Sequence, residues 1–107
     1  MTTKIVCLIG STRFEEAFHA ANRAETLAGN IVLTVGVFKD FHPKDDKERR
    51  ALNELHLRKI DLCNEVLVIN PGGYIGNGTR REYRYALDHG KPVRWLEEPE
   101  VLRDVLK

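Results

Sequence analysis

The chain has 107 residues, which is the size of one domain around one hydrophobic core. Its 17 Lys and Arg residues and 16 Asp and Glu residues leave a formal net charge of +1, which excludes a molecule-wide field that would attract nucleic acid or an anionic membrane. Two cysteines are too few for a disulfide scaffold, and the first residues resemble neither a signal peptide nor a membrane span. We therefore expect a cytoplasmic protein.

The first part of the chain alternates between strand and helix patterns. Residues 5–9 are an apolar run ended by Gly10, which predicts a strand buried on both faces. Apolar side chains then recur at helical spacing over residues 14–28, and Gly29 is a natural stop for that helix. Residues 31–38 are a second β-branched run and predict a second strand.

The same alternation continues to the end of the chain. A helix is expected over residues 47–64, and residues 65–70 predict a third strand. The remaining segments predict a helix over residues 79–89, a short strand over 93–96 and a last helix over 99–106. Either of two aspartates can cap the helix that starts near residue 47, namely Asp45 or Asp46.

Strands and helices that alternate in this way predict an α/β fold, with a parallel sheet covered by helices on both faces. Right-handed crossovers favour the strand order 2-1-3-4, in a small flavodoxin- or Rossmann-like three-layer sandwich of four or five strands. We expect one domain over residues 1–107. Such sheets bind ligands at the carboxyl ends of the strands, at a switch point that here lies between the first and third strands.

The first of two loops that meet at this switch point contains Gly10, Ser11, Thr12 and Arg13. A glycine there lets the backbone approach a ligand, and the amides that follow point outward at the positive end of a helix. Hydroxyl groups and a guanidinium would complete a cradle for phosphate or carboxylate. The alternative is a capping box, in which Thr12 only caps the helix and Glu15 bonds back to it.

The second loop follows the third strand and covers residues 71–79, with four of the eight glycines of the chain. So long a glycine-rich loop is costly in conformational entropy, which favours a binding role. Glu82 follows directly and could attack an electrophilic sugar carbon, or it could cap the helix by bonding to the amide of Thr79. The candidate substrate-binding residues of the two loops are Gly10, Ser11, Thr12, Arg13, Asn70, Gly72, Gly73, Tyr74, Gly76, Gly78 and Thr79.

Together these motifs resemble the nucleoside 2-deoxyribosyltransferase-like superfamily, which includes the 2′-deoxynucleoside 5′-phosphate N-hydrolases. The likeness rests on the loop that begins at Gly10, on the run from Glu82 to Ala86 and on the turn from Gly90 to Val93. It implies that the first loop holds the 5′ side of a nucleotide. It also implies that Glu82 is the nucleophile that displaces the base and forms a glycosyl-enzyme.

Two further sequence features bear on this resemblance. The stretch from Pro71 to Glu82 resembles, more weakly, the motif of the phosphoribohydrolases that release cytokinin bases from their 5′-monophosphates. Asp61 is the nearest candidate for the aspartate with which the transferase-like enzymes orient the sugar, so Glu82 and Asp61 are the expected catalytic residues. His56 lies more than one helical turn from Asp61, and we expect the two to face solvent rather than to form a pair.

The expected function is cleavage or transfer at the N-glycosidic bond of a nucleoside or nucleoside 5′-monophosphate. The alternative is a non-catalytic nucleotide-binding module that uses the same crevice. The histidines and cysteines show no metal-ligand spacing, so neither a metal nor another cofactor is expected. The expected partner is a small molecule rather than a nucleic acid polymer or a membrane.

Chain length also bears on assembly. Four strand–helix units use up the whole sequence and leave no insertion that could act as a lid. The crevice would then stay open unless a neighbouring subunit covers it, and the resembled families complete their sites across subunits. We therefore expect a homo-oligomer, most simply a homodimer.

Overall fold

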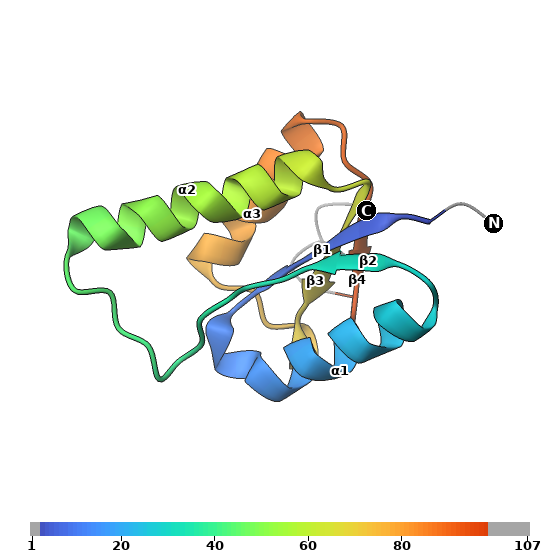
Figure 1. The fold of residues 1–107 in the computed structure, drawn as a ribbon, viewed down its shortest axis with the longest axis horizontal. Helices are drawn as coiled ribbons and strands as arrows, with labels where there is room; N and C mark the ends of the chain where they lie inside the picture. The colour runs from blue at the N-terminus through green and yellow to red at the C-terminus, as the bar shows by residue number, and fades with distance from the viewer. Residues whose placement is uncertain (1–2, 99–107) are drawn as a thin grey trace.

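Four parallel strands form the centre of the structure, in the order β2-β1-β3-β4 (Figure 1). The computed structural model describes residues 3–98. The strands are β1 (Ile5–Gly10), β2 (Ile31–Leu33), β3 (Glu65–Ile69) and β4 (Val93–Trp95). The helices are α1 (Glu15–Leu27), α2 (Asp46–Leu62) and α3 (Asn77–Asp88), with short 3-10 turns at Thr12–Phe14 and Pro71–Gly73. The predicted α/β class and strand order are confirmed, and the helix expected over residues 99–106 lies outside the described residues.

Helices cover both faces of the sheet. Cys7 and Ile9 of β1 pack with residues of α2 and α3, whereas Val6 and Leu8 pack with Phe18 of α1. This alternation follows the two-residue period of a strand, and it buries the middle of β1 on both sides. The structure is therefore the predicted three-layer sandwich, with α1 on one face and the other two helices on the opposite face (Figure 1).

The second strand is shorter than the sequence predicts, because it ends at Leu33 rather than near residue 38. As an edge strand it pairs only with β1. Beyond Leu33 the backbone is held by side chains instead: Lys59 Nζ donates a hydrogen bond of 2.7 Å to the carbonyl oxygen of Thr34, and Phe38 packs edge-on against Phe18. Residues 34–45 consequently form a long connection without helix or strand.

Of the two helix caps proposed for α2 and α3, one forms and one does not. Asp45 caps α2, accepting a hydrogen bond of 2.8 Å from the amide of Glu48, as predicted. The start expected for α3 is wrong by two residues, because the helix begins at Asn77 after an N-cap at Gly76. Thr79 therefore lies inside the first turn, and the capping box with Glu82 does not form.

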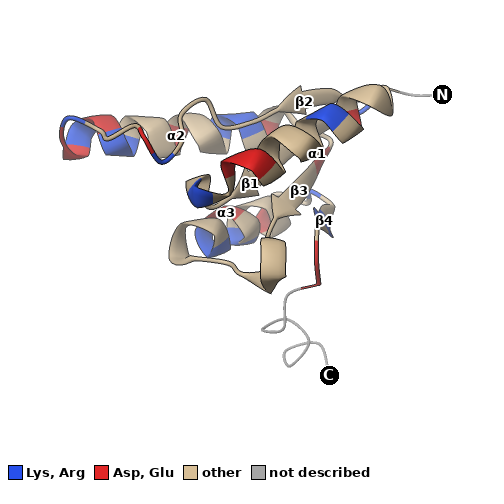
Figure 2. Ribbon diagram, turned by 90° about the horizontal axis from the view of Figure 1, so that it is seen from below, with Lys and Arg blue, Asp and Glu red and all other residues tan. Residues whose placement is uncertain are grey.

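The surface carries charges of both signs. Acidic and basic side chains alternate along α2, as Figure 2 shows, in agreement with the balanced composition. Among the helices that the structure describes, none is long and apolar enough to cross a membrane.

Candidate functional site

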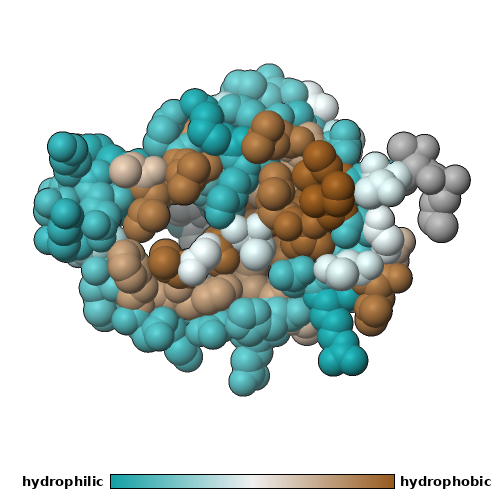
Figure 3. Space-filling view, viewed as in Figure 1, coloured by the Kyte–Doolittle hydropathy of each residue, from teal (hydrophilic) through white to brown (hydrophobic). Residues whose placement is uncertain are grey.

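A cleft of about 610 Å³ opens at the carboxyl end of β1, beside the start of α3. Its walls come from the loop after β1, the start of α3, one face of α2 and the connection 34–45. Figure 3 shows a hollow in this face of the molecule, with hydrophobic residues gathered around it. A cleft of this size and partly apolar lining is typical of a small-molecule site.

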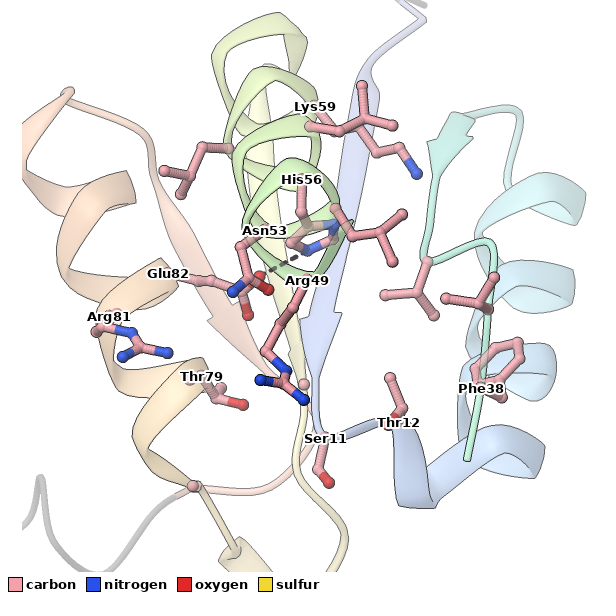
Figure 4. A pocket seen from close by; sticks show the side chains of 18 of the residues that line it. Ser11, Thr12, Phe38, Arg49, Asn53, His56, Lys59, Thr79, Arg81 and Glu82 are labelled. Atoms are coloured by element: carbon pink, nitrogen blue, oxygen red, sulfur yellow. Dashed lines mark ion pairs between the residues drawn. The ribbon is translucent and has the colours of Figure 1, made fainter. Parts of the chain in front are cut away.

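Glu82 projects into the cleft from the second turn of α3 (Figure 4). Its side chain is 22% exposed. Burial raises the pKa of this carboxyl from 4.5 to about 7, and the neighbouring Arg81 offsets only part of the rise. Near neutral pH the carboxyl is therefore protonated in about half of the molecules.

His56 faces Glu82 from α2, with Nε2 3.1 Å from Glu82 Oε2 (Figure 4). The residue is 8% exposed, and Nε2 has no hydrogen-bond partner of good geometry among the described residues. Burial, with the positive charge of Lys59 one turn further along α2, lowers the pKa of His56 from 6.5 to about 4. Near neutral pH the imidazole is uncharged, so this contact joins a neutral ring to a carboxyl group.

The expectation that His56 faces solvent is wrong. Its side chain belongs to the inward stripe of α2, which runs from Leu52 through His56 and Ile60 to Cys63 at helical spacing. That stripe was visible in the sequence, but the exposed Leu55 and Leu62 lie on another side of the helix and suggested a different inward face.

One end of the cleft is polar and suited to an anion. Ser11, Thr12 and Thr79 bring hydroxyl groups there, and Thr79 is only 4% exposed with no hydrogen bond to its hydroxyl among the described residues. The N-cap residue of α3, Gly76, has no side chain to cap the first amides of the helix, so these donors remain available. Arg49 and Arg81 add two guanidinium groups, which Figure 4 shows on either side of Thr79.

The other wall of the cleft is apolar, and the sequence analysis did not foresee it. Residues 34–45 contribute Val35, Val37, Phe38, Phe41 and Pro43 to the lining. Leu52, Leu55 and Leu57 of α2 continue the same wall. Because the β-branched run of residues 31–38 predicts a strand, this part of the site was not expected from the sequence.

About half of the predicted site residues meet in this cleft. Those that line it are Gly10, Ser11, Thr12, Gly76, Gly78, Thr79 and Glu82. Those that do not are Arg13, Asp61, Asn70, Gly72, Gly73 and Tyr74. The lining residues missed by sequence reasoning include three polar ones of α2, namely Arg49, Asn53 and His56.

Two of the predicted site residues outside the cleft, Arg13 and Tyr74, contact each other. The guanidinium carbon of Arg13 lies 4.5 Å from the centre of that ring, and Phe14 packs edge-on against it at 5.9 Å. Arg13 thus makes a cation–π contact beside the cleft. Thr12 does not cap a helix either, since the hydroxyl of Ser11 accepts from the amide of Arg13.

Asp61 and Asn70 are occupied by contacts within the fold. Asp61 Oδ1 accepts a 2.6 Å hydrogen bond from Tyr85 Oη, and Oδ2 lies 2.8 Å from Arg58 Nε. The hydrogen bond from Tyr85, with the charge of Arg58, lowers the pKa of Asp61. The buried Asn70 uses both ends of its amide on the backbone of Glu97. The functional roles suggested for these residues stay predictions.

Among the described residues, no group of three or more His, Cys, Asp or Glu side chains is arranged to hold a metal ion. Searches against protein-family models, curated proteins and solved structures found no match to this chain. The argument for function therefore rests on the geometry of the cleft.

Proposed function

We propose that the protein cleaves or transfers at the N-glycosidic bond of a nucleoside or nucleoside 5′-monophosphate, with Glu82 as the nucleophile. The observation that carries the proposal is a half-buried carboxyl group in a cleft with two unlike parts. Glu82 lines the same cleft as an apolar wall built on residues 34–45 and a polar end that contains Thr79 and Arg49. A nucleotide also has an apolar part and a charged part, because a planar base and a phosphate lie on opposite sides of its sugar. The base is bonded to the sugar carbon C1′.

In this proposal the carboxylate of Glu82 attacks C1′. The bond from C1′ to the base nitrogen breaks, and its electron pair leaves with the base. The glycosyl ester then reacts with water, which gives hydrolysis, or with a second base, which gives transfer. A likeness to the nucleoside 2-deoxyribosyltransferase-like superfamily is part of the same proposal and rests on the motifs of the two loops.

A panel of nucleosides and nucleoside 5′-monophosphates, assayed by chromatography for free base, tests this function. We expect release by the wild type and a loss of at least about 100-fold in Glu82→Gln, which keeps the size of the side chain. Release at the same rate by both proteins would refute the role of Glu82. Mass spectrometry of the wild type with a 2-fluoro sugar analogue should show the glycosyl group on the peptide that contains Glu82.

The raised pKa of Glu82 favours a second candidate, a non-catalytic nucleotide-binding module. A carboxyl that is half protonated at neutral pH is a weaker nucleophile than a fully ionised one. Thermal stabilisation by a nucleoside monophosphate without any release of base supports this candidate over the enzyme.

We also propose a homodimer that packs through the outward side of α2. Leu62 of this helix is 67% exposed and Leu55 is 54% exposed. Exposed leucines on one helix are typical of a protein–protein contact. A second subunit there would lie next to the apolar wall of the cleft, to which Leu55 belongs.

A further inference from the structure

We infer that His56 and Glu82 hold one proton between them, and that His56 passes this proton to the base as the base departs. This role of His56 rests on the proposed function and supplies the proton that the departing base takes up. A base that leaves as an anion is a poor leaving group, and a positioned acid typically accelerates such a step by about 100-fold or more.

Besides arginines, two other titratable side chains in the described part of the chain line the same cleft, Lys59 and Tyr85, but neither is a carboxylate or an imidazole. Glu82 is the one carboxylate and His56 the one imidazole among the described residues that line the cleft. Their closest atoms, Nε2 and Oε2, are 3.1 Å apart, and because Nε2 has no hydrogen bond of good geometry among the described residues, a small rotation of either side chain is needed to align them for proton transfer. No hydrogen bond from a described residue reaches Oε1 of Glu82, so this oxygen remains available to attack a sugar carbon.

The charged and titratable groups around the pair come from three elements. Lys59 and Arg49 lie on α2, Arg81 and Tyr85 lie on α3, and the buried Cys7 of β1 interacts electrostatically with Glu82. Burial raises the pKa of the Cys7 thiol to about 12, so this group keeps its proton throughout the range in which the pair titrates. The cations disfavour a second proton on the pair.

The pKa shifts of the two groups come from burial and from neighbouring cations, and they determine how many protons the pair carries. Glu82 takes up its proton near pH 7, and His56 takes up another only near pH 4. Between these values the pair carries one proton. That proton lies mainly on Glu82, and its movement across the contact to His56 Nε2 leaves an ionised Glu82 beside a protonated imidazole.

The reaction then balances at each step. Glu82 Oε1 bonds to C1′, the electron pair of the broken bond goes to the base nitrogen, and the proton of His56 Nε2 moves to that base. In the second step water bonds to C1′, its proton returns to His56 Nε2, and the electron pair of the ester bond returns to Glu82. The pair ends with the single proton with which it began.

The pH dependence of kcat/KM tests the inference on the free protein. In the wild type, with the most rapidly cleaved nucleotide of the panel, kcat/KM should fall above about pH 7, where the pair loses its proton. His56→Gln can bond to Glu82 but cannot carry the proton. Its kcat/KM should be at least about 30-fold lower at pH 6 and should rise with pH as Glu82 ionises. The control His19→Gln changes an exposed histidine of α1 and should keep the wild-type profile.

A second measurement does not depend on turnover. In a protein labelled with ¹⁵N-histidine, the ring nitrogens of His56 should shift near pH 7, where Glu82 titrates, and Glu82→Gln should remove that step. A single step near pH 6.5 in both proteins would overturn the shared proton. Base release that rises through pH 7 in both the wild type and His56→Gln would overturn the delivery by His56 while leaving the proposed function intact. No release of base from any compound of the panel would instead refute the proposed function, and the delivery with it.

Discussion

A Cβ atom on residue 10 would lie 2.5 Å from the carbonyl oxygen of Ile69. Gly10 and Ile69 are the last paired residues of the parallel strands β1 and β3. Gly10 has a φ of 152°, which a side chain strongly disfavours. The glycine therefore brings two strand ends, and the two loops that follow them, close enough to share one cleft.

Gly10→Ala should lower the free energy of unfolding by about 1–3 kcal/mol, because the methyl group would collide with backbone that cannot yield easily. Urea denaturation measures this change. Gly36→Ala is the matched control, since Gly36 has no atom within 4 Å of an added Cβ and no positive φ. Equal midpoints for the two variants would contradict the close approach of β1 to β3.

Asp61→Asn distinguishes the catalytic role predicted for Asp61 from a purely structural role in its contacts with Tyr85 and Arg58. The side chain bonds to Tyr85 and Arg58 and does not line the cleft. We expect Asp61→Asn to change kcat/KM for base release by less than about threefold, against about 100-fold or more for Glu82→Gln. A loss comparable with that of Glu82→Gln would restore Asp61 to the catalytic site.

The contributions of Glu82 and His56 to the free energy of unfolding should change with pH in opposite directions. Glu82 has a pKa of about 7 when folded and 4.5 ordinarily, so the folded protein binds more protons than the unfolded chain between these values. Its contribution to the free energy of unfolding therefore falls by about 3 kcal/mol as pH rises through that window. His56 has a pKa of about 4 against 6.5, and its contribution rises by about 3 kcal/mol between those values.

In the wild type the two contributions nearly cancel between about pH 4.5 and 6.5. Relative to the wild type, His56→Gln should become less stable from about pH 4 to 6.5, and Glu82→Gln should become more stable from about pH 4.5 to 7. Urea denaturation at pH 5 and 7.5 measures both differences. Parallel curves for the two variants would show that the groups do not titrate as a buried pair.

Arg49→Gln tests the polar end of the cleft as a binding site for an anion. Arg49 lines the cleft, where its Nη1 also pairs with Asp46 Oδ1 at 2.6 Å, whereas the guanidinium of Arg13 lies on the ring of Tyr74. We expect Arg49→Gln to weaken binding of a nucleoside 5′-monophosphate by about tenfold and to leave binding of the nucleoside unchanged, because one charged hydrogen bond is lost. Calorimetric titration measures both. A selective loss in Arg13→Gln instead would support the first loop of the sequence analysis as the phosphate site.

Leu62→Asp tests the homodimer. A charge at this exposed position of α2 should convert a dimer into a monomer, since an isolated charge is costly to bury in an interface. Leu27→Asp is the control, because Leu27 is 78% exposed on α1, on the other face of the sheet. Sedimentation equilibrium distinguishes the outcomes. A wild type that is monomeric at working concentration would refute the dimer and favour the binding module over the enzyme.

Patterns that depend on burial were predictable from the sequence. The apolar runs of β1 and β3 and the helical spacing of α1 were sufficient for the fold class and the strand order, because both strands are buried on two faces. The end of β2 was not predictable, since a β-branched run at the edge of a sheet continues as a strand only where it has a partner. Beyond Leu33 the backbone of this run bonds to Lys59 instead.

The site was predictable only where it follows the strand ends. Glu82 and the hydroxyls of the first loop reach the cleft because they come directly after β1 or at the start of α3. His56 was missed because its contact with Glu82 depends on how α2 packs on α3, which no local pattern determines. The contact of Arg13 with the ring of Tyr74 was not predictable for a similar reason, and the binding role suggested for Tyr74 stays a prediction.

Under the proposed function, the connection 34–45 determines which ligand fits the cleft, while residues of α2 and α3 carry out the chemistry. It supplies the apolar wall of the cleft but none of the residues that hold or move a proton. Doubling the length of such a loop costs only about 0.6 kcal/mol of closure entropy. The same sheet, with Glu82 and His56 unchanged, can therefore be adapted to a larger or smaller ligand by lengthening or trimming one surface segment.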